Sequence, residues 1–152
     1  MKGIVMRISN LITLACALGL PHFSNEAGAA ELQSERAALE ECGAYSEAGM
    51  RECLAKKSHQ SAVVLRRAEE RAIAALSNWD ENAKFINLAK EKLRVSNKAY
   101  AQYRDAQCAF AASLGGGAIG NALELRRLSC LVGLNNGRTK QLNADSSELP
   151  PK

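Results

Sequence analysis

The stretch SLGGGAIGNALELRRLSC (residues 113–130) decides how this chain folds. Gly115, Gly117 and Gly120 have the spacing of the glycine fingerprint that binds dinucleotides. That fingerprint needs a strand before the turn and a helix after it, inside a β-α-β unit. The residues before Gly115 have the composition of an amphipathic helix instead. We therefore interpret the glycines as the turn between two antiparallel helices, and we predict no nucleotide cofactor.

Cysteines flank this turn on both sides. Cys108 precedes it and Cys130 follows it, so antiparallel helices would place the two at similar heights on facing elements. Cys42 and Cys53 flank a second turn that begins at Gly43. Four cysteines allow three connectivities. We favour Cys42–Cys53 and Cys108–Cys130, and each loop closure would contribute about 3 kcal/mol in the chain-entropy model.

The remaining composition is typical of helices. Ala, Leu, Glu, Lys, Arg and Gln dominate, and no proline occurs between Pro21 and Pro150. The expected class is therefore all-α: a small antiparallel bundle of helices, stapled by two disulfides. We expect helices over residues 31–42, 46–76, about 82–114 and 118–131, followed by a break at 135–137 and a short helical turn over 138–142.

Apolar residues at helical spacing predict the buried faces. In the second helix the stripe consists of Met50, Leu54, Ser61, Leu65, Ala68, Ala72 and Leu76. In the third helix it consists of Phe85, Leu88, Ala89, Ala99, Tyr100, Tyr103, Phe110 and Leu114. The charged run at residues 66–71 lies mostly off the first stripe, as a solvated face would.

The first 30 residues have the order of a secretory signal peptide. Lys2 and Arg7 precede an apolar run at residues 11–20, and small residues follow at 27–30. We expect residues 1–30 to be removed, leaving a helical domain over 31–142 and a disordered polar tail over 143–152. The chain would then be periplasmic or secreted, an environment in which disulfides persist.

A lipid anchor at Cys16 is a weaker alternative. Thr13 occupies the place where the recognition sequence for lipid attachment usually has leucine. The apolar run is also too short to cross a bilayer, and no later segment is long enough. We therefore expect no membrane span.

Composition argues against several function classes. The net charge of +4 is far from the value typical of nucleic-acid-binding domains. His59 is the only histidine after the signal segment, and no Cys-x-x-Cys pair occurs, so a zinc site is not expected. The paired acids Glu40-Glu41 and Glu69-Glu70 are sequence neighbours, which point in different directions on a helix. We therefore expect a protein that is not an enzyme and needs no cofactor or metal.

The segment NKAYAQYRDAQC (residues 97–108) is the most distinctive part of the chain. Two tyrosines, an Arg-Asp step and a cysteine are followed by the glycine turn, a second cysteine and Arg138. With Cys42 and Cys53, this order resembles the lysozyme inhibitor LprI-like domain family, small exported helical domains, over about residues 42–142. Asn97 and Tyr100 stand where the family usually has Gln and Trp, and Asn135 stands where a Thr usually caps the last helix.

The family-motif residues have several candidate roles, structural or in binding: Tyr100, Tyr103, Arg104, Asp105 and Arg138. Both tyrosines are expected in the core with hydrogen-bonded hydroxyls. Arg104 and Asp105 are adjacent on a helix, so we expect each to meet a different partner. Arg104 or Arg138 is expected to cap helix carbonyls or to bridge to a buried carboxylate.

The resemblance implies a protein partner, a lysozyme-type muramidase, that is inhibited when its substrate cleft is covered. The alternative is a structural or adaptor protein of the cell envelope, because a shared fold does not fix a shared ligand. Many lysozymes are basic, so a basic inhibitor would rely on local acidic patches. The acidic N-terminal end is the candidate contact surface, with Glu31, Glu35, Glu40, Glu41, Glu47 and Glu52.

Overall fold

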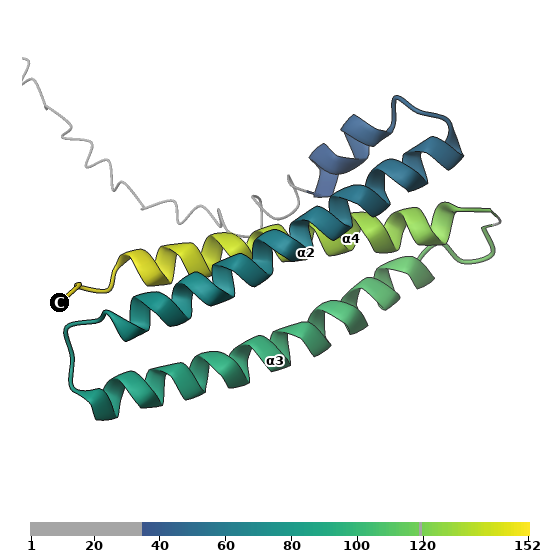
Figure 1. Cartoon of the computed structure of the whole chain (residues 1–152). Helices are drawn as coiled ribbons and strands as arrows, with labels where there is room; N and C mark the ends of the chain where they lie inside the picture. The colour runs from purple at the N-terminus through teal and green to yellow at the C-terminus, as the bar shows by residue number, and fades with distance from the viewer. Residues whose placement is uncertain (1–34, 119) are drawn as a thin grey trace, which may run out of the picture.

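The structure is a computed structural model that describes residues 35–118 and 120–152 (Figure 1). A short helix covers residues 35–42, and three long helices follow: α2 (Glu47–Ser77), α3 (Ala83–Ser113) and α4 (Ala122–Ser147). α2 and α4 lie side by side and run in the same direction, whereas α3 runs in the opposite direction (Figure 1). The described residues contain no strand beyond one isolated bridge. The expected all-α class is confirmed.

Polar caps start two of the long helices. The Ser46 side chain accepts a hydrogen bond from the backbone N–H of Gly49 at the start of α2. The Asn82 side chain accepts one from the N–H of Lys84 at the start of α3. These caps satisfy N–H groups that have no partner within the helix. The first cap ends the turn between the short helix and α2, and the second ends the turn that makes α2 and α3 antiparallel.

Both predicted disulfides are present. Cys42 pairs with Cys53, and Cys108 pairs with Cys130. The first joins the short helix to α2, and the second joins α3 to α4. Cys42 and Cys108 are fully buried, so each bridge is part of the core.

The core follows the predicted stripe of α2. Six of its seven positions are buried, and Met50 packs against them. Leu54 meets the short helix and α4, whereas Leu65 and Ala72 meet the far end of α4 at Leu142. Within the described residues, no helix is long and apolar enough to cross a membrane.

The predicted buried face of α3 is wrong. Phe85, Leu88, Tyr103, Phe110 and Leu114 are each at least half exposed. Ile86 and Cys108 are buried instead, and Leu93, Tyr100 and Ala111 pack against the core clusters. α3 has two apolar sides, and the bond from Cys108 to Cys130 turns the side that carries the cysteine toward α4.

The predicted break at residues 135–137 is also wrong, because α4 continues through it to Ser147. Asn135 and Gly137 are weak helix formers, but Asn135 is buried and hydrogen-bonded to other helices. Tertiary contacts therefore outweigh local propensity here.

Residues 143–152, predicted as a disordered tail, begin with the last turns of a helix and end in backbone contacts with another part of the chain. α4 extends past Leu142 to Ser147, so the helical part ends later than predicted. Beyond it, the Asp80 N–H donates to the Pro150 carbonyl, and the Lys152 N–H donates to the Asn78 carbonyl, at 2.9 Å each. The end of the chain thus lies against the turn between α2 and α3. The predicted signal segment, residues 1–30, and Cys16 lie outside the described residues.

Candidate functional site

The family-motif residues of α3 meet α4 and α2 in a polar cluster halfway along the bundle. Arg104 donates to Asn135 Oδ1 at 3.3 Å, and Asn135 Nδ2 donates to Ser61 Oγ at 3.0 Å. This chain of contacts crosses from α3 through α4 to α2. Asn135 is only 2% exposed, so its amide is satisfied by other side chains and not by bulk water. The cluster fixes the relative positions of the three long helices.

Arg104 and Asp105 form an ion pair with each other, contrary to the prediction that each meets a different partner. The Arg104 Nη2 lies 2.8 Å from Asp105 Oδ1, and its Nε lies 2.9 Å from the same oxygen. The guanidinium stem is long enough to turn back toward the neighbouring carboxylate, which is 65% exposed. Adjacent backbone directions therefore do not exclude this pair.

Arg138 is buried and hydrogen-bonds neutral side chains. It donates to Ser96 Oγ at 2.9 Å and to Asn97 Oδ1 at 3.0 Å on α3, and to Gln141 Oε1 at 2.8 Å on α4. Its guanidinium carbon also lies 5.3 Å from the centroid of the Tyr100 ring, a cation–π distance. Neither carbonyl capping nor a carboxylate bridge, the two roles predicted for it, occurs in these contacts. Arg138 instead joins α4 to α3.

Glu69 on α2 faces the same cluster. Burial raises the pKa of its carboxyl, and the opposite charges of Arg138 and Arg104 partly offset this effect. In the sequence, Glu69 stands out only as one of a pair of neighbouring acids. Asn135, expected to cap the last helix, lies instead inside α4 and contacts Arg104 and Ser61. Ser61, the single polar residue in the α2 stripe, is the signal in the sequence that a polar contact enters the core.

The two tyrosines have different surroundings. Tyr100 is half-buried, and its hydroxyl donates to the Leu134 carbonyl at 2.7 Å, as predicted for a core aromatic. Tyr103 is 54% exposed, so its predicted place in the core is wrong. The ring centroids are 6.1 Å apart. Only Tyr100 belongs to the polar cluster.

The acidic residues of the N-terminal end differ in their contacts. Three of them accept hydrogen bonds from other parts of the fold. Glu41 accepts from Lys57 Nζ at 2.6 Å, and Ser129 Oγ donates to Glu35 at 3.1 Å. Glu47 accepts from the backbone N–H of Asn121 at 2.8 Å, which ties the start of α2 to the turn before α4. Glu40 and Glu52 are exposed, and the described residues give them no ion pair. Glu31 lies outside the described part of the chain.

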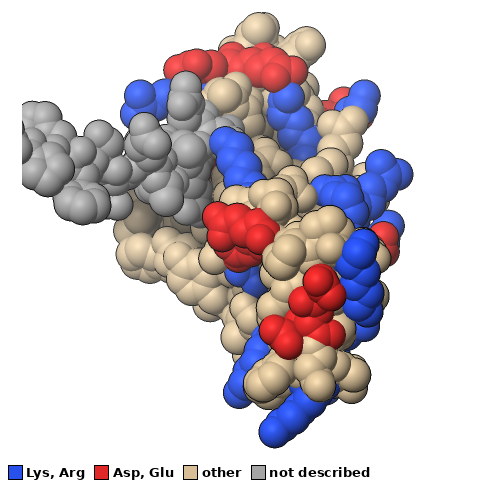
Figure 2. Space-filling view, turned by 90° about the vertical axis from the view of Figure 1, so that its left-hand side faces the viewer, with Lys and Arg blue, Asp and Glu red and all other residues tan. Residues whose placement is uncertain are grey.

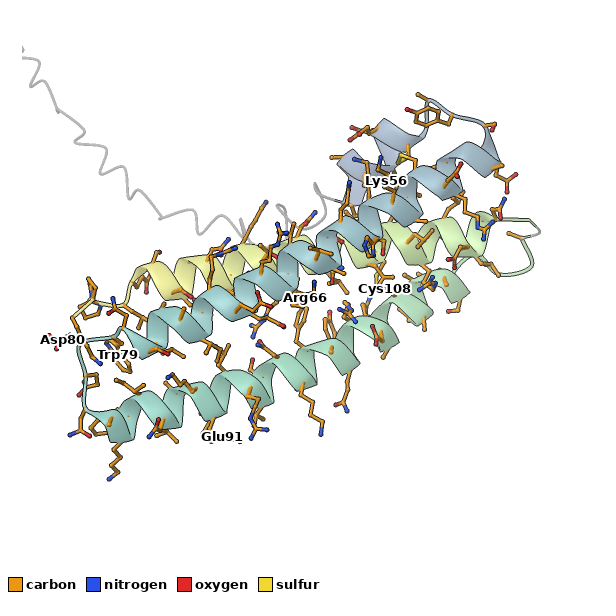
Figure 3. The ribbon with its side chains drawn as sticks, in the orientation of Figure 1. Lys56, Arg66, Trp79, Asp80, Glu91 and Cys108 are labelled. Atoms are coloured by element: carbon orange, nitrogen blue, oxygen red, sulfur yellow. A yellow bond between two sulfur atoms is a disulfide. The ribbon has the colours of Figure 1, made fainter. Side chains whose placement is uncertain are left out.

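A groove lies beside the Cys42–Cys53 bridge at this end, where Figure 3 labels Lys56. It has a volume of about 820 Å³, and Glu41, Tyr45, Glu52 and Lys56 are among the residues that line it. Tyr45 is 61% exposed at the turn before α2. Tyrosine is enriched among residues that dominate binding energy at protein interfaces. We call Tyr45, Glu40, Glu52 and this groove the tip surface.

The comparisons with known proteins give one family. A model described as "Lysozyme inhibitor LprI" matches residues 31–142. A comparison with curated proteins and with solved structures finds no significant match to either. The matched range includes the four disulfide cysteines, the polar cluster and the tip surface.

Proposed function

Because the chain belongs to the lysozyme inhibitor LprI family, we propose that it inhibits lysozyme-type muramidases by protein–protein contact, without catalysing a reaction itself. The family match over residues 31–142 is the observation that carries this proposal. The two disulfides and the family point to a place outside the cytoplasm. Residues 1–30 would act as the signal peptide for export to the periplasm or the medium.

The tip surface is the proposed contact with the muramidase. The Cys42–Cys53 bridge holds the turn that carries Tyr45, so little conformational freedom would be lost on binding. The exposed carboxylate of Glu52 lines the same groove as Tyr45, and together with exposed Glu40 on the short helix it would favour a basic partner. The polar cluster, in contrast, lies halfway along the bundle and holds the three long helices together.

A turbidity assay of muramidase activity on bacterial cell walls tests this function. The exported protein should inhibit at least one lysozyme type at micromolar concentration, which is an order-of-magnitude expectation for a specific protein contact. The double variant Tyr45→Ala/Glu52→Lys should weaken inhibition by a factor of at least about 10, because a central aromatic contact and a favourable charge are lost. The matched control Tyr103→Ala removes a similarly exposed tyrosine from α3 and should inhibit normally.

The outcomes separate the proposals. Full inhibition by the tip variant would reject the tip surface but keep the inhibitor function. No inhibition of several lysozyme types by the unaltered protein would reject the function itself. A pull-down from periplasm that repeatedly returned one partner other than a muramidase would then favour the adaptor alternative.

A further inference from the structure

The side of α3 that faces away from α2 and α4 carries an apolar stripe, which Lys92 interrupts between Leu88 and Val95. It consists of Phe85, Leu88, Val95, Tyr103, Phe110 and Leu114, which are 50–61% exposed. The intervals between them are three, four, seven or eight residues, so all lie on one side of the helix. Figure 3 shows side chains projecting from α3 away from the other two long helices. We call these six residues the outer stripe.

The outer stripe is long for a surface that no described part of the chain covers. α3 has 31 residues, which corresponds to a length of about 46 Å. Most of the large hydrophobic residues that the structure exposes belong to this stripe, whereas α2 exposes only Val64 and Ile73 to a lesser degree. Single exposed hydrophobic residues are ordinary, but several large ones along one side of a helix are typical of an interaction surface.

Charges beside the outer stripe are mostly basic. α3 carries six basic and two acidic side chains, a net charge of +4. Both acids are already paired, Glu91 with Arg94 and Asp105 with Arg104. Lys84, Lys92 and Lys98 are exposed and have no ion pair within the part of the chain that the structure describes. In Figure 2, Lys and Arg side chains border the lower part of the surface, where α3 begins.

The net positive charge of α3 distinguishes between the possible binding partners of the outer stripe. A second copy packed through the same stripe would bring two helices of net charge +4 together, and like charges at an interface oppose binding. A basic lysozyme would meet the same repulsion. An anionic lipid surface would attract the lysines, whose long stems let the ammonium groups reach the headgroups while the apolar side chains enter the interface.

We propose that the outer stripe of α3 binds reversibly to the surface of membranes that contain anionic lipids. The helix would lie flat in the interface, with Phe85, Val95 and Phe110 directed into the acyl boundary. Lys84, Lys92 and Lys98 would contact the phosphate groups. The chain would thereby be kept at the membrane surface without a span and without a covalent lipid.

Vesicle co-sedimentation tests this binding with the exported protein, whose N-terminus is first read by mass spectrometry. The protein should bind phosphatidylglycerol-containing vesicles, bind phosphatidylcholine vesicles much more weakly, and dissociate as salt is added. Replacement of Lys84, Lys92 and Lys98 by Gln should weaken binding on the order of 100-fold, since each basic residue near an anionic surface contributes a factor of about five. The double variant Val95→Asp/Phe110→Asp should abolish binding while its thermal unfolding stays cooperative.

A matched control is available on α2. Val64→Asp/Ile73→Asp also places two carboxylates at exposed hydrophobic positions, and it should bind vesicles almost normally. Equal binding by the α3 and α2 double variants would overturn the proposal, as would a lack of preference for phosphatidylglycerol. A stable dimer of the unaltered protein that the α3 variant converts to a monomer would overturn it in favour of a second copy. Muramidase inhibition by the α3 variant reports separately on the proposed function.

Discussion

The hydroxyl of Tyr100 donates a 2.7 Å hydrogen bond to the backbone carbonyl of Leu134, which joins the middle of α3 to the middle of α4. The ring of Tyr100 also lies beside the Arg138 guanidinium. One aromatic side chain therefore connects two helices through its hydroxyl and its face. This arrangement explains why Tyr100, and not Tyr103, is turned toward the bundle.

Tyr100→Phe should lower the free energy of unfolding by about 1 kcal/mol, because the hydroxyl's hydrogen bond is lost while the ring remains. Urea denaturation, followed by circular dichroism, measures this change. Tyr103→Phe is the matched control, since the Tyr103 side chain is exposed and its loss of a hydroxyl should change stability by less than about 0.5 kcal/mol. Equal effects of the two substitutions would contradict the assigned role of Tyr100.

Asn135→Ala should destabilise the protein by about 2 kcal/mol, because the Arg104 guanidinium and the Ser61 hydroxyl each lose a partner inside the bundle. The neighbouring substitution Asn136→Ala removes the same group from a less buried position. It should be neutral or slightly stabilising, since alanine is the better helix former. If Asn135 acted as a helix cap at a break, the double variant Arg104→Ala/Asn135→Ala would show additive effects; the contact predicts a coupling.

The sequence predicts parts of the fold where one signal dominates. The α2 stripe was found because its buried residues recur on a single side, and both disulfides because glycine turns lie between the paired cysteines. The predicted face of α3 was wrong because apolar residues lie on two of its sides, and no local rule says which side meets α4. The predicted break at Asn135 failed because its partners, Arg104 and Ser61, come from distant parts of the chain.

The candidate site was predictable only in part, for a related reason. The family motif indicated Tyr100, Arg104 and Arg138, but their partners depend on how three helices are placed. Tyr45 was not singled out, since one aromatic residue in a turn has no pattern of its own. Its exposure beside the Cys42–Cys53 bridge becomes visible only when the short helix packs on α2.

The two disulfides should each stabilise the fold by about 3 kcal/mol in the chain-entropy model. The bridge Cys108–Cys130 closes a loop of 22 residues and Cys42–Cys53 one of 11, so the first should contribute slightly more. Paired Cys→Ala variants, unfolded in urea, test this order. The Cys42→Ala/Cys53→Ala variant should also lose muramidase inhibition at a temperature at which it is still folded, because the turn that carries Tyr45 is released. Retained inhibition would mean that the bridge does not preorganise the tip surface.

Stability should depend on pH through Glu69. Burial raises the pKa of this carboxyl, so the folded protein binds the proton more tightly than the unfolded chain does. The unfolding free energy therefore falls as the pH rises from the ordinary glutamate pKa through the raised one. Glu69→Gln removes this loss, so it should be more stable than the unaltered protein at neutral pH and equal to it in acid. Urea midpoints measured across this pH range give the comparison.

Glu124→Gln serves as the control of opposite sign. The hydrogen bond from Arg127 lowers the pKa of the Glu124 carboxyl, so its contribution is present at neutral pH and is lost as the pH falls. This variant should be less stable than the unaltered protein at neutral pH and should approach it in acid. If Glu69→Gln, like Glu124→Gln, were less stable than the unaltered protein at neutral pH, burial would not be destabilising the Glu69 carboxylate.

The turn between α3 and α4 offers a test of why glycines are needed there. Gly116 has a φ of +56°, a left-handed conformation that costs an L-residue about 1–2 kcal/mol. Gly117, its neighbour, lacks a positive φ, and a Cβ added there would meet nothing within 4 Å. Gly116→Ala should therefore destabilise the protein by about 1 kcal/mol, whereas Gly117→Ala should stabilise it by about 0.5 kcal/mol through the entropy of the unfolded chain. Thermal unfolding of the two variants measures the difference. A destabilisation by both would mean that the turn needs glycine for its lack of a side chain, and not only for its left-handed backbone.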